Sequence, residues 1–117
     1  MIDSEKRAST SGKALSITGI NFATCCSRTK YKNRDDLLLI VLDPGSQVCG
    51  CFTDSSMPSA PVIWSKKNIK KANNLKQKNV LLINAGNANA FTGEEGLIAC
   101  KEKSLALANI FNCDKSN

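Results

Sequence analysis

The feature that most constrains the fold is an apolar segment that leads, through a loop of small residues, into a helical pattern. Residues 79–83 (NVLLI) are rich in branched apolar side chains, which predicts a buried strand. Residues 84–96 (NAGNANAFTGEEG) form a polar loop, and residues 97–111 follow with helical periodicity. Because α/β proteins bind ligands at the ends of their strands, we expect a ligand site in this loop.

The start of the helix is marked by residues that cap helices. Thr92 is a suitable N-cap, and Glu95 three residues later completes the pattern of a capping box. Glu94 and Glu95 also place negative charge at the positive end of the helix dipole. These features predict a well-defined first turn.

The helix is expected to bury one face against a sheet. The residues of that face recur at spacings of three and four: Leu97, Cys100, Ser104, Leu107 and Phe111. The charged residues between them are expected mostly on the opposite side: Lys101, Glu102 and Lys103.

Three asparagines, Asn84, Asn87 and Asn89, are the candidate binding groups of the loop. A primary amide offers two donors and one acceptor without titrating, so it can orient an acyl carbonyl or a substrate amide. The alternative is that these side chains bond to the backbone of their own loop and tolerate left-handed dihedrals. A phosphate cradle is disfavoured, since the loop's glycines do not form GxGxxG and two carboxylates open the helix.

This loop resembles the signature loop of the ornithine acetyltransferase family, the bifunctional glutamate N-acetyltransferases of arginine biosynthesis. Four upstream segments resemble early strands and connections of that family in the same order: residues 19–23 (GINFA), 32–40 (KNRDDLLLI), 50–53 (GCFT) and 60–62 (APV). The resemblance covers roughly residues 16–113. Two departures are residues 54–58 (DSSMP), where members often carry an Asn-containing turn, and Ala85, where a serine is common.

The resemblance implies a transfer of acetyl from N-acetylornithine to glutamate by a ping-pong scheme. Family members cut themselves before a threonine, which becomes the nucleophile of the second chain and uses its own α-amino group as base. A Thr-Gly pair supplies the oxyanion hole. The resemblance implies no other cofactor and leaves acetyl-CoA open as an acetyl donor of the full enzyme.

We expect this chain to be the N-terminal portion of the α-chain, inactive alone, with no catalytic residue of its own. Thr92-Gly93 belongs to the capping loop, and the catalytic Thr-Gly pair and the nucleophile are expected beyond residue 117. The residues that the resemblance assigns to the active-site loop are Asn84, Gly86, Asn87 and Asn89. The expected partners are the rest of the α-chain and the β-chain, docked on an exposed apolar sheet face.

Composition leaves two other classes of function open. The net charge is +6, and a basic cluster lies between residues 66 and 78: Lys66, Lys67, Lys70, Lys71, Lys76 and Lys78. The cluster contains no arginine and no interleaved aromatic residue, which disfavours nucleic-acid binding and favours a solvated face. A lysine-rich nucleic-acid-binding domain, or a small-molecule-binding domain without catalysis, remains the alternative.

The cysteines are expected to be reduced and structural. There are six, in CC and CxC spacings, with no histidine in the chain, so a metal site is disfavoured. No secretory pattern precedes them, which disfavours disulfides, and Cys49 and Cys51 are expected as buried thiols on one strand face. With no apolar run longer than residues 37–42, we expect a cytoplasmic protein.

The predicted fold class is α/β (α+β), with a small mixed or antiparallel sheet and a C-terminal helix packed on it, as part of a layered ornithine-acetyltransferase-like fold. At 117 residues, one domain (15–117) behind a disordered arm (1–14) is expected. The other predicted elements are strands at residues 15–26 (broken at Gly19), 37–42 and 47–53, and a short helix at residues 61–68 anchored by Trp64. The three strands are expected to form an antiparallel meander.

Overall fold

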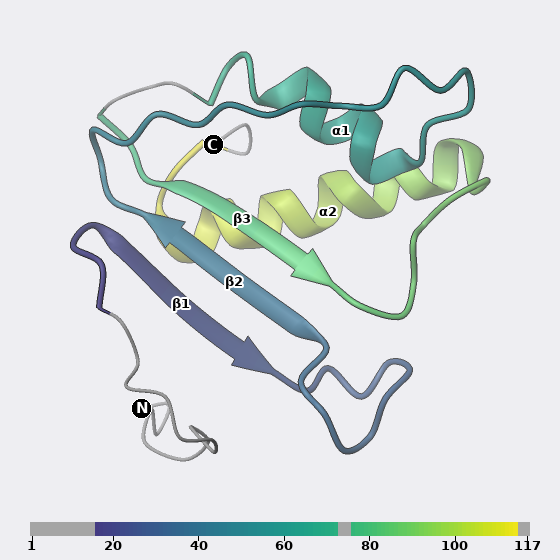
Figure 1. Ribbon diagram of the computed structural model, residues 1–117, viewed down its shortest axis with the longest axis horizontal. Helices are drawn as coiled ribbons and strands as arrows, with labels where there is room; N and C mark the ends of the chain where they lie inside the picture. The colour runs from purple at the N-terminus through teal and green to yellow at the C-terminus, as the bar shows by residue number, and fades with distance from the viewer. Residues whose placement is uncertain (1–15, 73–75, 115–117) are drawn as a thin grey trace.

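A computed structural model describes residues 16–72 and 76–114 of the chain. The predicted arm at residues 1–14 lies outside these ranges. Five elements follow in the order β1 (Ile20–Cys25), β2 (Leu37–Leu42), α1 (Ala60–Asn68), β3 (Asn79–Asn84) and α2 (Gly93–Phe111) (Figure 1). The predicted α+β class is therefore confirmed. No helix in the described ranges is long and apolar enough to span a membrane.

The three strands form one antiparallel sheet in the order β1-β2-β3. The apolar strand β2 is central, as its sequence LLLIVL predicts, and Ile40 lies between Phe22 of β1 and Leu81 of β3. β1 begins after Gly19, whose positive φ of 83° makes the predicted break. β1 and β2 form a hairpin, whereas β3 reaches the sheet only after the chain has passed through α1 (Figure 1).

The prediction of a third strand at residues 47–53 is wrong. This segment has no regular structure and runs past α1, while the position beside β2 is taken by β3 (Figure 1). Gly50 lies under the end of α1, where an added Cβ would be 3.1 Å from Ile69 Cδ1. Glycine weakens a strand and permits this close approach. As a result Cys49 and Cys51 are exposed thiols and not the expected buried pair.

The helix α2 follows Thr92, the predicted N-cap, but its first turn is not capped as expected. It begins at Gly93, and the Thr92 hydroxyl forms no cap hydrogen bond, so the expected capping box is absent. The hydroxyl instead donates to the Asn89 Oδ1 atom at 2.9 Å. Thr92 has helical dihedrals (φ −100°, ψ 0°), whereas a capping side chain needs extended ones.

The inner surface of α2 lies toward α1 and toward the sheet. The Trp64 Nε1 atom on α1 donates to the Ser104 Oγ atom on α2 at 2.9 Å, which confirms Trp64 as an anchor. The expected inner residues of α2 are each only partly exposed, in agreement with the helical pattern. A left-handed Asn112 (φ 52°) ends the helix, and the Cys113 N–H bonds back to the Ala108 carbonyl.

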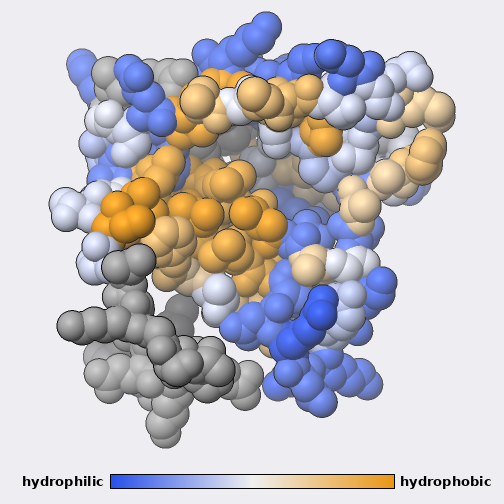
Figure 2. All heavy atoms as spheres, in the orientation of Figure 1, coloured by the Kyte–Doolittle hydropathy of each residue, from blue (hydrophilic) through white to orange (hydrophobic). Residues whose placement is uncertain are grey.

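One face of the sheet is apolar and bare. The pairing register puts Phe22, Leu81 and Ile83 on the same face, and they are 55%, 51% and 45% exposed. Figure 2 shows the hydrophobic surface that covers the front of the sheet, whereas α2 passes behind β3 in the same view (Figure 1). The expected exposed apolar face is therefore present.

Asp36 holds the connection between β1 and β2 in place. Its side chain is 6% exposed and accepts hydrogen bonds from the Ser27 N–H at 2.5 Å and the Ser27 Oγ at 2.7 Å. Its backbone carbonyl accepts from the Ala85 N–H at 2.8 Å, so Asp36 also ties this connection to the loop after β3. The two Ser27 hydrogen bonds hold the pKa of the Asp36 carboxyl below its usual value.

Asp36→Asn is expected to destabilise the fold. An amide has one neutral oxygen where the carboxylate uses two charged ones, so one Ser27 donor loses its acceptor and the other keeps only a neutral one. Because the folded pKa is depressed, the carboxylate's contribution is complete above the unfolded pKa and is lost as the pH falls through the folded pKa. We expect the melting temperature of the variant to be several degrees lower at pH 7, and the difference to shrink below about pH 4.

The matched control for thermal unfolding is Asp54→Asn. Asp54 is exposed, and this substitution removes the same charge as Asp36→Asn. Equal melting temperatures for the two variants at neutral pH would show that the Asp36 hydrogen bonds contribute nothing measurable.

Candidate active-site loop

The loop between β3 and α2 is built from residues that accept left-handed backbone conformations. Positive φ angles occur at Gly86 (94°), Asn89 (48°), Phe91 (56°) and Gly93 (56°). Glycine and asparagine adopt this region readily, which explains their number here. Phe91 does not favour it, yet its side chain is 84% exposed and gains no packing in return.

Asn89 is the structural centre of the loop. Its Nδ2 atom donates to the Gly96 carbonyl at 3.1 Å and lies 3.6 Å from the Cys100 Sγ atom, while its Oδ1 accepts from Thr92. Its own N–H donates to the Asn87 Oδ1 atom at 2.9 Å. Both ends of this amide are therefore occupied within the protein, as the backbone-capping alternative predicted.

The side chains of Asn84 and Asn87 each form a hydrogen bond through only one end of the amide. The Asn84 Nδ2 atom donates to the Asn87 carbonyl at 3.0 Å, and the Asn87 Oδ1 atom accepts from Asn89. Within the described residues, no hydrogen bond involves the Asn84 Oδ1 atom or the Asn87 Nδ2 atom. The pair therefore offers one free acceptor and one free donor group, which together complement the N–H and C=O of an amide.

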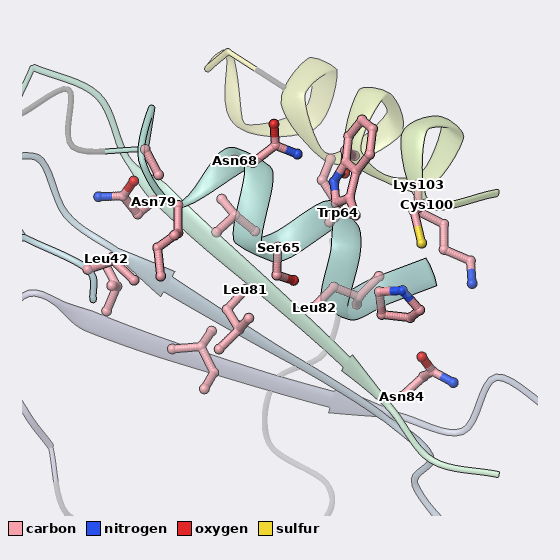
Figure 3. A pocket seen from close by; sticks show the side chains of 18 of the residues that line it. Leu42, Trp64, Ser65, Asn68, Asn79, Leu81, Leu82, Asn84, Cys100 and Lys103 are labelled. Atoms are coloured by element: carbon pink, nitrogen blue, oxygen red, sulfur yellow. The ribbon is translucent and has the colours of Figure 1, made fainter. Parts of the chain in front are cut away.

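These asparagines line a cavity of about 260 Å³ between β3, α1 and α2 (Figure 3). Its walls include Leu82 of β3 and Trp64 of α1, and Cys100 and Lys103 of α2 contribute a thiol and an ammonium group. Lys103 is exposed, as expected of the charged side of α2, but it also borders the cavity. Lys103 is three residues after Cys100 and four before Leu107, so it borders the inner face.

The cavity lining contains no carboxylate among the described residues, and Lys103 is its one cation. Cys100, Lys103 and Ser104 are lining groups of nucleophilic type, but no carboxylate or imidazole among the described lining residues accompanies them as a general base. In the same ranges, no three His, Cys, Asp or Glu side chains lie together as a metal site, and all six cysteines are free thiols. The chemistry available here is the orientation of a neutral or anionic ligand.

Gly86, the fourth residue assigned to the loop, does not line the cavity. It packs against the β1–β2 connection, where the Lys30 Nζ atom donates to its carbonyl at 3.1 Å. An added Cβ would be 2.8 Å from Tyr31 Cε2 and 2.9 Å from Lys30 Cδ, so only glycine fits. Arg34 stacks on Tyr31, with the Arg34 Cζ atom 3.7 Å from the centroid of the Tyr31 ring.

The contacts of Lys30, Tyr31 and Lys103 are absent from the sequence-based account. Lys30 and Tyr31 lie in a charged turn, and Lys30 precedes Gly86 by 56 residues. No local sequence pattern indicates that this turn contacts Gly86. The helical spacing of Lys103 from Cys100 was the one available signal for its place at the cavity.

Comparison with known proteins gives one consistent result. The ArgJ family model matches residues 21–117. The chain is 42% identical over 101 residues to the arginine biosynthesis bifunctional protein ArgJ of Nitrobacter winogradskyi, covering 86% of this chain and 24% of that protein. It is 48% identical over 97 residues to the ArgJ protein of Mesorhizobium japonicum, covering 83% of this chain and 22% of that protein.

A solved structure shares the fold. The crystal structure of the ArgJ protein of Bacillus halodurans superposes with a TM-score of 0.71 at 24% identity, covering 85% of this chain and 50% of that one. The chain spans about a quarter of the length of the curated relatives that it matches. Because the family model covers most of its length, this chain belongs to the ArgJ family.

Proposed function

We propose that this chain is the N-terminal segment of the α-chain of an enzyme that transfers acetyl from N-acetylornithine to glutamate. The observation that carries the proposal is a family match over residues 21–117 in a chain that spans only a quarter of its relatives. A cavity lined by amides, with no carboxylate or imidazole among its described lining residues, agrees with a segment that binds substrate and leaves the reaction to other parts.

In this proposal the free atoms of the loop orient the substrate. The N–H of an acetamido group donates to the Asn84 Oδ1 atom, and its carbonyl accepts from the Asn87 Nδ2 atom. Lys103 in the same cavity pairs with the carboxylate that both amino-acid substrates carry. Holding the acetyl group in one orientation accelerates its transfer because less freedom is lost on the way to the transition state.

The remaining polypeptide supplies the covalent chemistry. An N-terminal threonine attacks the acetyl carbonyl, its α-amino group takes the proton, and ornithine leaves; glutamate then accepts the acetyl group from the threonine ester. A Thr-Gly pair stabilises the oxyanion in both steps. In the full enzyme acetyl-CoA serves as a further acetyl donor, a role that fits the word "bifunctional" in the names of the relatives.

The bare face of the sheet is where the remaining polypeptide packs in this proposal. Phe22, Leu81 and Ile83 expose large apolar side chains on one face. These side chains are about half exposed, so burying the remainder of each is worth roughly 1 kcal/mol and together favours docking of the remaining polypeptide. Exposed apolar surfaces of this kind mark interaction sites in soluble proteins.

We expect the purified 117-residue chain to show no turnover of N-acetylornithine and glutamate. Mixing or co-expressing it with the remaining residues of the Nitrobacter winogradskyi relative should restore acetyl transfer, measured as N-acetylglutamate formed. Phe22→Asp together with Ile83→Asp places two charges in the docking face, at residues outside the cavity lining, and should abolish this restoration. Turnover by the chain alone would refute the proposal.

The control for that experiment is Ile110→Asp. Ile110 is 72% exposed on α2 and lies outside the sheet, so its loss should leave the restored activity unchanged. Loss of activity with the control and the docking-face variant alike would point to general misfolding.

A second prediction separates the roles of two asparagines in the restored enzyme. Asn87→Asp keeps the oxygen that accepts from Asn89 and removes the donor group, so it should lower kcat/KM roughly 10–100-fold, the loss of about 1.4–2.8 kcal/mol of hydrogen bonding. Its melting temperature should stay near that of the parent. Asn89→Ala removes the side-chain hydrogen bonds to Gly96 and Thr92 and should lower the melting temperature by several degrees. Unchanged kcat/KM in Asn87→Asp would exclude the proposed contact.

A further inference from the structure

The positive charge of this protein is concentrated in one part of the chain. Residues 55–93 contain six lysines and no aspartate or glutamate, whereas the charges of the remaining residues cancel. The net charge of +6 therefore belongs to α1 and the segment that follows it. Figure 2 shows the hydrophilic surface along the upper edge of the molecule, over α1.

Three of these lysines share a groove between α1 and the loop that precedes it. Lys66, Lys67 and Lys70 line a hollow of about 560 Å³ together with Thr53 and Ser55. The other lining residues are Asp54, Pro58, Val62 and Ile63. All three lysines are exposed, so their ammonium groups are accessible to a ligand.

The hydroxyl groups of the groove are arranged to donate outward. The Thr53 Oγ1 atom accepts from the Ser55 N–H, and the Ser55 Oγ atom accepts from the Met57 N–H, both at 3.2 Å. Each turn uses one lone pair of its hydroxyl oxygen, and neither O–H group has an acceptor in the described residues. The groove thus offers three ammonium groups and two hydroxyl donors, against the single carboxylate of Asp54.

Helix stability accounts for only part of this arrangement. Lys66 and Lys67 lie in the last turn of α1, where positive charge stabilises the negative end of the helix dipole. Lys70 lies beyond the helix, and the two hydroxyl groups belong to another segment, so the dipole does not explain why they converge on one groove.

We propose that this groove binds the phosphate group of a small phosphate-bearing molecule. A phosphate offers at least three acceptor oxygens and a charge near −2, which matches a set of five donors better than a carboxylate does. The apolar side chains of Val62 and Ile63 give the uncharged part of the ligand a surface to cover. A nucleic-acid strand fits less well, since the groove has no aromatic residue for base stacking. The site is separate from the Asn-loop cavity, and its failure would leave the proposed acetyl transfer intact.

The probe is inorganic pyrophosphate, titrated into the 117-residue chain by calorimetry at low salt. Lys66→Gln, Lys67→Gln and Lys70→Gln together should weaken binding at least about tenfold, since each lost pair of this kind is worth up to about 1 kcal/mol. The matched control replaces Lys32, Lys78 and Lys101 by glutamine, which removes the same charge from exposed positions outside the groove. The control should bind within about twofold of the parent.

The three single groove variants should each lose about two- to fivefold in affinity for pyrophosphate, so the test holds even if the triple variant fails to fold.

Two further titrations identify the source of the phosphate. Coenzyme A that binds as tightly as pyrophosphate or more tightly, with the same loss in the groove variant, would support a phosphate-bearing small molecule. Single-stranded RNA whose affinity grows with length and falls steeply with salt would overturn the proposal in favour of a nucleic-acid surface. Equal weakening in the groove variant and the control, or no pyrophosphate binding to the parent at millimolar concentration, would also overturn it.

Discussion

The carboxylate of Asp36 and the backbone beside it connect the two loops on which the candidate site depends. The side chain orders the β1–β2 connection through Ser27, and the carbonyl of the same residue binds the first N–H of the Asn-rich loop at Ala85. Lys30 of the ordered connection then reaches Gly86. The position of the asparagines is therefore set from outside their own loop, by a hairpin far away in sequence. Because a buried carboxylate is costly without donors, this arrangement has few alternatives of similar energy.

The core of this chain is too small for its surface. The buried apolar residues of the described ranges are Val41, Ala60, Ala72 and Ala108, and no large side chain there is fully enclosed. Meanwhile large apolar side chains are exposed on the sheet and on both helices. A domain of this length normally buries well over half of the surface that its unfolded chain exposes. The imbalance is expected of a segment whose sheet forms the middle of a larger layered structure, and it agrees with a chain that spans a quarter of its relatives.

Local patterns in the sequence predicted most of the elements but not their arrangement. The runs that became β2, β3, α1 and α2 were all recognised, because apolar periodicity and proline placement act within a few residues. Residues 47–53 have strand-like composition, but β3 occupies the edge of β2 and Gly50 approaches the end of α1 instead. The Thr92 hydroxyl was expected to cap α2 and instead donates to Asn89, because Thr92 has helical and not extended dihedrals. The place of Gly86 against Tyr31 depends on a contact between distant segments, which local rules do not describe.

The asparagines illustrate how far residue type alone can assign a role. Asn84, Asn87 and Asn89 are equivalent in the sequence, yet the fold uses both ends of Asn89 and leaves one end each of Asn84 and Asn87 for a ligand. What these atoms can do is limited by their chemistry, since an amide neither titrates nor attacks a carbonyl. The amides, the lysine and the apolar wall of this site can select and orient an acyl compound, and in the proposed function the reacting groups come from another segment. Under the proposed function, the chemistry of the cavity and the exposed face of the sheet have one physical explanation, because the same remaining polypeptide would complete both.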